Sequence, residues 1–171
     1  MDHIVLIGMP GSGKSTIARR LSGILSLPFL DGDTEIEKRT GETLSATIAR
    51  IGLQGFLRLE EQTILSLSLA GTVFAPGGSS VYSPAAMSYM KSNALTIYLE
   101  VPLKDLQNRT GSLEKRGVVI RNGQSFEDLY RERVPLYLQY ADLTLDARNL
   151  SADEVLERLL PQITSLGIAR S

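Results

Sequence analysis

Short apolar runs alternate with longer segments of helical periodicity along the chain. The apolar runs predict strands at 4–7, 27–31, 71–75, 94–101 and 143–145. The segments between them predict helices at 14–25, 34–51 with a break at Thr40-Gly41, 56–69, 84–91, 102–110, 126–140 and 151–165. The run 4–7 is apolar throughout, as in a strand covered on both faces. The alternation is typical of βαβ units and predicts an α/β fold with a parallel sheet.

Nothing in the sequence divides the chain into domains. It has 171 residues without an internal repeat, a charge block or a Pro/Ser-rich linker, so we expect one domain over 1–171. The segment 111–124 has weak periodicity, with glycines and an asparagine interrupting charged and then aliphatic residues. Such a segment is either an ordinary surface loop or a lid over a binding site.

Composition narrows the possible functions. Hydrophobic residues make up 43% of the chain and the net charge is -1, so no global field favours nucleic acid or an anionic membrane as a partner. Arginine supplies 13 of the 18 cationic residues, and its planar fork suits carboxylate and phosphate. Cysteine is absent and His3 is the single histidine, which excludes disulfides, thiol nucleophiles and Cys/His metal clusters. We expect a cytoplasmic monomer with a local anion-binding site.

A phosphate-binding loop follows the first predicted strand. Gly8-Met9-Pro10-Gly11-Ser12-Gly13-Lys14-Ser15 matches the Walker A pattern and lies between a strand and a helix, the context that the motif requires. Its glycines let backbone N–H groups surround a phosphate at the positive end of a helix. Lys14 is expected at the β and γ phosphates, and the Ser15 hydroxyl at Mg²⁺. The expected nucleotide-binding residues of the segment are Gly11, Ser12, Gly13, Lys14, Ser15 and Thr16.

Other motifs narrow the class of P-loop protein. The Asn-Lys-x-Asp motif that a GTPase uses to bind guanine is absent from the sequence. The third predicted strand ends in Ala75-Pro76-Gly77, without the acidic residue usual in mechanical ATPases. The acids follow the second strand instead, as Asp31-Gly32-Asp33, which is typical of a small-molecule kinase.

Asp31 and Asp33 are the candidate catalytic carboxylates. One residue apart on an extended backbone, they would point to the same face, and Gly32 would permit a tight turn. One carboxylate can bind Mg²⁺ through water, while the other can accept a proton from a substrate hydroxyl that attacks the γ-phosphate.

Over nearly its full length the chain resembles shikimate kinases. The matching segments are Met9 to Thr16, Phe29-Leu30-Asp31-Gly32-Asp33, Glu35-Ile36-Glu37-Lys38-Arg39-Thr40-Gly41, Gly77-Gly78, Tyr98-Leu99-Glu100, Arg109-Thr110, Arg133-Val134-Pro135-Leu136-Tyr137 and Ala141-Asp142. The Asp-x-Asp-x-x-Ile-Glu-x-Arg-x-Gly and Arg-x-Pro-Leu-Tyr segments are far more specific than Walker A.

The resemblance implies a fold and an activity. The fold would be a three-layer α/β/α sandwich around a five-stranded parallel sheet, of the nucleoside-monophosphate-kinase type. The family transfers the γ-phosphate of ATP to the 3-hydroxyl of shikimate, with Mg²⁺, in aromatic amino-acid biosynthesis.

The resemblance also implies roles for single residues. Asp31 would be the carboxylate on the Mg²⁺ side, and Asp33 would orient or deprotonate the acceptor hydroxyl. Gly78 would lie against the substrate ring and Arg133 would hold its carboxylate. Arg116, on the lid, would contact the ATP phosphates, and Arg148 would lie along the adenine.

The chain departs from the family pattern on the acceptor side. Where the family has Phe-Arg-x-x-Glu, this chain has Phe56-Leu57-Arg58-Leu59-Glu60. One residue turns a helical side chain by about 100°, so Arg58 should project elsewhere unless the helix is shifted in register; it is either a substrate ligand or a solvated arginine. Ser79 stands where the family has a third glycine, and Gly117 where it has proline after Arg116.

Three functions remain open on the sequence. The first is phosphorylation of shikimate, and the second is phosphorylation of another hydroxylated small molecule. The third is nucleotide binding without transfer, against which the retained Lys14, Ser15, Asp31 and Asp33 argue.

Overall fold

The chain folds around one parallel sheet. The structure is a computed structural model that describes residues 3–109, 118–121 and 123–168. The elements, in chain order, are β1 (Ile4–Ile7), α1 (Lys14–Leu25), β2 (Phe29–Asp31), α2 (Gly32–Thr40), α3 (Leu44–Ser66), β3 (Val73–Ala75), the 3-10 helix η1 (Gly78–Tyr82), α4 (Pro84–Asn93), β4 (Leu95–Glu100), α5 (Leu103–Arg109), α6 (Phe126–Tyr140), β5 (Leu143–Asp146) and α7 (Ala152–Ser165).

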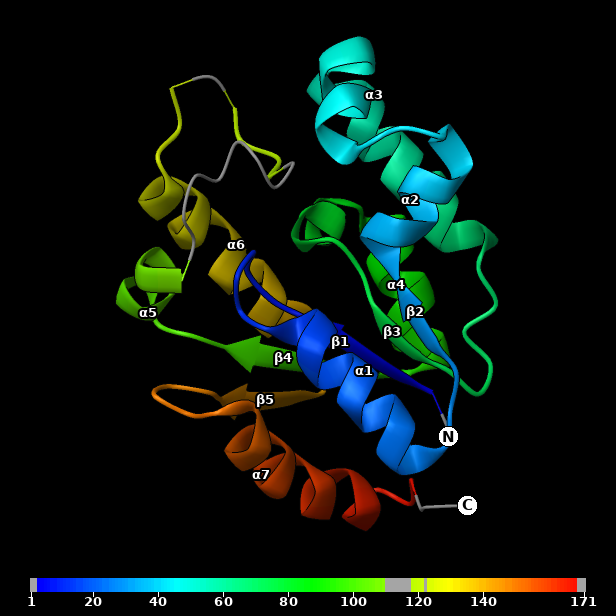
Figure 1. Cartoon of the computed structure of the whole chain (residues 1–171), viewed down its shortest axis with the longest axis vertical. Helices are drawn as coiled ribbons and strands as arrows, with labels where there is room; N and C mark the ends of the chain where they lie inside the picture. The colour runs from blue at the N-terminus through cyan, green and yellow to red at the C-terminus, as the bar shows by residue number, and fades with distance from the viewer. Residues whose placement is uncertain (1–2, 110–117, 122, 169–171) are drawn as a thin grey trace.

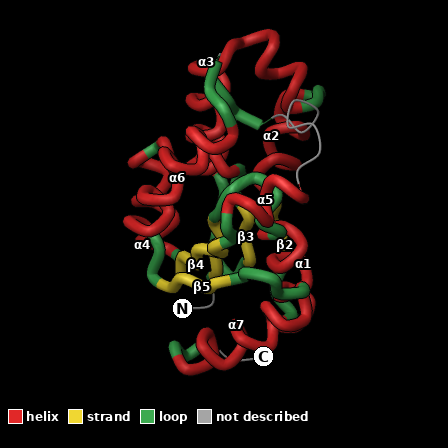
Figure 2. Tube along the Cα trace, turned by 90° about the vertical axis from the view of Figure 1, so that its left-hand side faces the viewer, coloured by secondary structure: helices red, strands yellow, loops and turns green. Residues whose placement is uncertain are grey.

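Helices cover the sheet on both faces. The strand order is β2-β3-β1-β4-β5 and every neighbouring pair is parallel, with Ile4 opposite Val73 and Leu95. Helices α1 and α7 pack against each other on one face, while α4 and α6 pack on the other (Figure 1). Figure 2 shows the α2–α3 region extending away from the sheet. The predicted three-layer α/β/α sandwich with five parallel strands is confirmed.

The hydrophobic core is centred on strand β1. All four residues of β1 are buried, as the continuous apolar run predicts, and they join a cluster that extends from α1 to α7. A second, smaller apolar cluster of Ile36, Leu44, Phe56 and Val119 lies under α2 and α3. No helix in the described ranges is both long enough and apolar enough to span a bilayer.

Two helix predictions need correction. The predicted helix starting at 34 begins at Gly32, directly after β2. The helices expected at 34–51 and 56–69 meet inside α3, where Gly52 has φ 69° and ψ 171° and interrupts the helical geometry. The break at Thr40-Gly41 is confirmed, since Gly41 ends α2 in the left-handed conformation. The sequence pattern did not predict η1.

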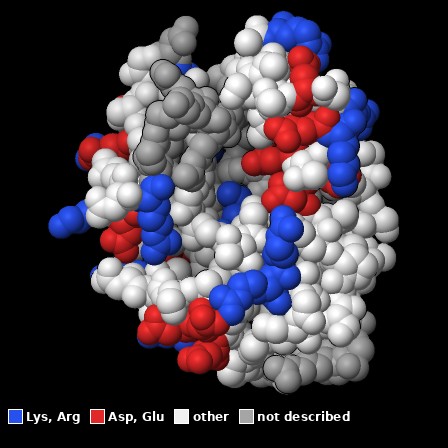
Figure 3. All heavy atoms as spheres, viewed as in Figure 1, with Lys and Arg blue, Asp and Glu red and all other residues white. Residues whose placement is uncertain are grey.

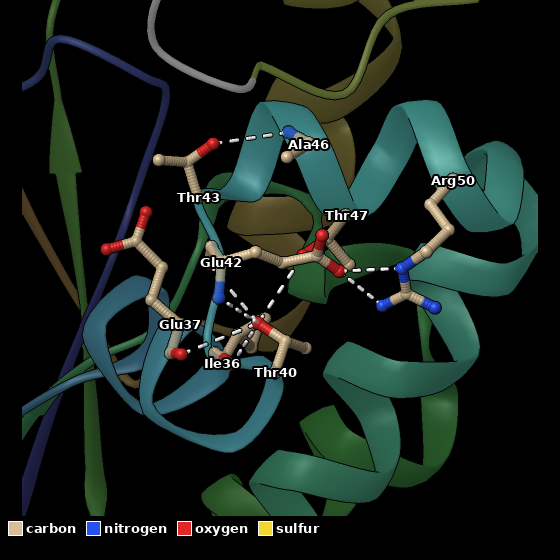
Figure 4. A network of polar contacts seen from close by, with 8 residues as sticks. All are labelled: Ile36, Glu37, Thr40, Glu42, Thr43, Ala46, Thr47 and Arg50. Carbon is tan, nitrogen blue, oxygen red and sulfur yellow. Dashed lines mark hydrogen bonds and ion pairs between the residues drawn. The ribbon is translucent and has the colours of Figure 1, made fainter.

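A polar network joins α2 to α3 (Figure 4). The Thr40 hydroxyl donates to the Ile36 carbonyl at 3.0 Å and accepts from the Glu42 N–H at 3.4 Å and the Thr47 hydroxyl at 3.4 Å. Arg50 Nε donates to Glu42 Oε1 at 2.7 Å. These contacts hold the turn between the two helices and so set where the start of α3 lies above the sheet.

Gly32 is required for close packing rather than for a tight turn. It lies within a helix, and a Cβ there would be 2.9 Å from the Cα of Pro76. Gly32→Ala should therefore destabilise the fold by about 1–3 kcal/mol, because backbone must shift to make room. Urea unfolding would measure the change.

Gly23→Ala is the matched control. Gly23 also lies in a helix, and a Cβ there would meet nothing within 4 Å. We expect this substitution to stabilise the protein by about 0.5–1 kcal/mol. Equal effects of the two substitutions would contradict the packing argument.

Candidate functional site

The glycine-rich loop after β1 has the backbone of an anion site. Gly11 and Gly13 have φ values of 81° and 91°, conformations that favour glycine. Gly13 precedes the first residue of α1 and no side chain caps this helix end. The first N–H groups of α1 therefore remain available to a phosphate. Buried Ser12 also has a hydroxyl without a partner among the described residues.

Two cavities flank this loop. One, of about 190 Å³, is lined by Pro10, Gly11, Lys14, Ser15, Asp33, Leu44, Phe56, Gly77, Gly78, Ser79, Val118, Val119 and Arg133; we call it the acceptor cavity. The other, of about 140 Å³, is lined by Ser12, Gly13, Thr16, Ile17, Leu99, Arg109, Ala147, Leu150, Ala152 and Val155; we call it the nucleotide cavity. Figure 3 shows this face of the molecule hollowed, with basic side chains inside the hollow.

Lys14 and Asp33 both line the acceptor cavity, and each charge acts on the other. Burial lowers the pKa of the Lys14 ammonium, and the charges of Asp33 and Asp31 oppose that shift. Asp33 opens to the solvent in the cavity, yet protein surrounds its carboxyl group, so desolvation raises its pKa while Lys14 opposes the rise. Ser15 lines the same cavity as these two residues.

Asp31 is oriented differently from the expectation of two carboxylates on one extended segment. Only Asp31 is extended; Gly32 and Asp33 already belong to α2. Asp31 Oδ1 accepts from the Thr34 N–H at 3.1 Å and so caps the helix. Helix formation, not strand alternation, therefore directs Asp33 into the acceptor cavity.

Arg133 is the largest fully buried side chain of the described residues. It is 1% exposed on α6, where its Nε donates to the Tyr82 hydroxyl at 3.2 Å and its Nη2 to the Val119 carbonyl at 2.8 Å. The guanidinium also lies 5.0 Å from the centroid of the Tyr82 ring. No carboxylate in the described ranges forms an ion pair with Arg133, although it lines the acceptor cavity, so its positive charge has no counterion among the described residues.

Gly78 lets backbone approach this arginine. A Cβ at Gly78 would lie 3.1 Å from Arg133 Nη1, 3.1 Å from Pro10 Cδ and 3.2 Å from the Tyr137 hydroxyl. Tyr137 lies one helical turn after Arg133 and donates to the Gly78 carbonyl at 2.6 Å. Sequence reasoning named Gly78 and Arg133 but no role for Tyr137, although the spacing of four places both side chains on one face of α6.

Arg58 lies outside the acceptor cavity. It is exposed on α3 and borders a separate depression of about 160 Å³, together with Leu57, Glu61 and Tyr82. Leu57 also packs against the small apolar cluster under α2 and α3. The structure thus favours the solvated-arginine interpretation, because Arg58 is exposed and does not line the acceptor cavity.

Two arginines lie in or next to the wall of the nucleotide cavity. Arg148 is exposed and forms an ion pair with Asp146 at 3.9 Å, directly after Ala147 of the nucleotide cavity. Arg109, which had no predicted role, lines that cavity. Arg116 and most of the predicted lid at 111–124 lie outside the described residues, while Val118 and Val119 line the acceptor cavity.

Glu60 is a buried acid that sequence reasoning left without a role. It is 2% exposed and lies on the buried face of α3 with Phe56, Thr63 and Ile64. An acidic residue at a position on this inward-facing side of the helix was the sequence signal that could have identified it. Glu60 Oε2 accepts from the Ser79 hydroxyl at 2.6 Å. A Cβ at Gly77 would overlap Glu60 Oε1 and lie 3.0 Å from Asp33 Oδ1, so both carboxyl groups approach this glycine.

Burial governs the protonation of Glu60. Desolvation raises the pKa of its carboxyl to about 7, and the charge of Asp33 adds to the rise. The Ser79 hydrogen bond, Arg133 and Lys14 oppose it. Below that pH, Glu60 is therefore mainly the neutral acid in the folded protein.

Comparisons with known proteins agree on one family. The family model for shikimate kinase matches residues 10–164. A shikimate kinase of Pasteurella multocida is 36% identical over 168 residues, which cover 96% of each chain. A shikimate kinase of Buchnera aphidicola is 39% identical over 157 residues, or 90% of this chain and 91% of that protein.

Solved structures give the same result. Shikimate kinase from Acinetobacter baumannii, in complex with shikimate, superimposes with a TM-score of 0.88 at 29% identity, covering 97% of this chain and 94% of that one. Thymidylate kinase from Candida albicans, with a TM-score of 0.62 at 15% identity, shares the fold.

Glu60→Gln tests the protonation of the buried acid through stability. Below the ordinary glutamate pKa of 4.5 the two proteins should differ little, since Glu60 is neutral in both the folded and unfolded states. Between pH 4.5 and about 7 the unfolded glutamate ionises while the folded one stays neutral, so the wild type loses stability as pH rises. The Gln variant should gain about 3 kcal/mol relative to wild type over this range. Urea unfolding at several pH values measures it, and a constant difference would contradict the assignment.

Proposed function

The chain belongs to the shikimate kinase family, and we propose that it transfers the γ-phosphate of ATP to the 3-hydroxyl of shikimate. Buried Arg133 is the observation that carries this choice of acceptor. Its guanidinium faces the same cavity as Lys14 and Asp33 and has no carboxylate partner in the described part of the chain. A buried cation without a counterion favours an anionic ligand, and shikimate supplies a carboxylate.

Transfer of the phosphoryl group requires that the two substrates be correctly positioned and that one group accept a proton. The acceptor hydroxyl oxygen attacks the γ-phosphorus, the bond from phosphorus to the β–γ bridging oxygen breaks, and Asp33 takes the hydroxyl proton. Desolvation of the Asp33 carboxyl raises its pKa and makes the carboxylate a stronger base than a fully hydrated aspartate. Lys14 stabilises the charge that develops on the phosphoryl oxygens.

Mg²⁺ fits the available donors if phosphates and water complete its shell. The described residues contain no group of three or more acidic or histidine side chains able to hold a metal, which is expected where the nucleotide carries the ion. Ser15 would ligate Mg²⁺ through its hydroxyl, and Asp31 would bind it through water from its capping position. The ion, when bound, neutralises phosphate charge.

The nucleotide cavity would hold the base of ATP. Its walls combine Ser12 and Gly13 of the loop and Thr16 of α1 with the apolar side chains of Leu99 and Leu150, a surface suited to a flat ring. Arg148 and Arg109 would border the nucleotide. We further propose that the protein acts as a cytoplasmic monomer.

The acceptor is tested directly with a coupled assay for ADP. Shikimate at millimolar concentration should support turnover, and product analysis should give shikimate 3-phosphate. The absence of ADP release above background would contradict this acceptor. A panel of hydroxylated acids and sugars would then identify the acceptor that this kinase uses instead, and Leu57 would be an adaptation to that acceptor.

Asp33→Asn tests the proton acceptor. The amide cannot take the hydroxyl proton, so kcat should fall by roughly 10²- to 10⁴-fold while ATP binding persists. Glu35→Gln is the control, because Glu35 lies on the same helix but pairs with Lys38. Nucleotide fluorescence would monitor binding, and retained turnover in the Asn variant would favour a different base.

Arg133→Ala and Arg58→Ala test which arginine binds the acceptor. Loss of a charged hydrogen bond should raise the KM for shikimate by about 10- to 150-fold in the first variant. The second should change it less than about twofold, since Arg58 lies outside the acceptor cavity. Circular dichroism checks folding, and Arg133→Lys, which keeps the charge, should be intermediate. Equal effects at the two positions would contradict the placement.

A further inference from the structure

Glu60 lies where the acceptor cavity and the neighbouring depression share a wall. Ser79 lines both, and Glu60 lines the second. Its Oε2 is held by the Ser79 hydroxyl at 2.6 Å, whereas Oε1 is buried without a partner in the described ranges. The carboxyl group is thus fixed in place but only half satisfied.

Charged groups from three other elements surround this carboxyl at longer range. Lys14 on α1 and Arg133 on α6 are the cations that act on it, and Asp33 on α2 is the nearest acid that does so. None of the described cations forms an ion pair with Glu60. On its own helix, Arg58, which is exposed, and Glu61 border the outer depression, and Tyr82 lines it as well.

This arrangement favours the neutral acid. A buried carboxylate without a paired cation loses hydration that one hydroxyl replaces only in part. At low pH Glu60 is therefore an uncharged group, hydrogen-bonded to Ser79 in the wall of the acceptor cavity, consistent with its raised pKa.

The state of Glu60 changes the charge that an acceptor meets. With Glu60 neutral, Lys14, Arg133 and Asp33 give the site one net positive charge. With Glu60 ionised the net charge becomes zero, while the anion-binding Arg133 remains in place. In a cavity of low effective dielectric constant, one added negative charge weakens the binding of a carboxylate appreciably.

We propose that Glu60, held by Ser79, is a specificity-determining residue that sets the affinity of the acceptor cavity for a carboxylate-bearing acceptor. The neutral acid preserves the positive field around Arg133, and ionisation of Glu60 cancels it. Glu60 acts through the field rather than through contact with the reacting atoms. The inference rests on the proposed function, in which Arg133 binds the acceptor carboxylate.

The KM for shikimate as a function of pH tests the inference with the full chain. Between pH 6 and 8.5 it should rise by about five- to tenfold in the wild type. Glu60→Gln should keep, over the whole range, the lower KM that the wild type has at pH 6. Glu61→Gln is the matched control: it removes the adjacent acid, whose partner is Ser83, and should retain the pH dependence. A pH-independent KM in the wild type, or the same rise in Glu60→Gln, would overturn the inference.

Two further measurements separate Glu60 from other titrating groups. The KM for ATP should lack the Glu60-dependent rise, because a change in Lys14 would affect nucleotide binding as well. The carboxamide of shikimate, which lacks the negative charge, should show no dependence on Glu60. A rise of equal size with the carboxamide would contradict an effect exerted through the acceptor charge.

Carbon-13 NMR of the glutamate side chains gives a readout without substrate. The signal absent from Glu60→Gln should titrate near pH 7, and Ser79→Ala should move the midpoint upward because it removes a hydrogen bond that stabilises the carboxylate. A midpoint at an ordinary glutamate pKa, or one unchanged in Ser79→Ala, would overturn the inference. Loss of shikimate turnover at every pH would contradict the proposed function instead, whereas turnover with a constant KM would contradict only the role of Glu60.

Discussion

The close approach of side chains to the backbone of Gly77 and Gly78 is the constraint on which the acceptor cavity depends. Any side chain at Gly77 would overlap Glu60, and one at Gly78 would press against Arg133 and the Tyr137 hydroxyl. Because both residues are glycines and carry no side chain, groups from α2, α3 and α6 can meet at the end of β3. A cavity of about 190 Å³ remains between them and the phosphate-binding loop.

Placing several charges at one poorly hydrated edge makes their protonation interdependent. Burial opposes the charge of Lys14, Asp33 and Glu60 alike, but the first two stabilise each other across the cavity. Among the described residues, Glu60 has only the Ser79 hydroxyl as a hydrogen-bond partner and is the group most easily held neutral. The balance of the site is therefore positive, which suits phosphate on one side and a carboxylate on the other.

Local sequence patterns predicted the elements well where one interaction dominated. The apolar run of β1 and the glycines of the loop predicted the central strand and the start of α1. The pattern was less accurate at α2, where the Asp31 side chain caps a helix that begins two residues earlier than predicted. It also missed η1, which is short and depends on packing between α3, α4 and α6.

The sequence alone determined the fold class, the family and the position of the glycine-rich loop between β1 and α1, because these depend on contiguous motifs with fixed spacing. Only the tertiary structure decided what surrounds Glu60 and which arginine faces the acceptor, because these depend on contacts between distant segments. Arg58 and Arg133 are indistinguishable as chemical groups, yet helix orientation exposes one and buries the other at 1%. Likewise Ser79 and Glu60, 19 positions apart, become a hydrogen-bonded pair only when η1 packs against α3.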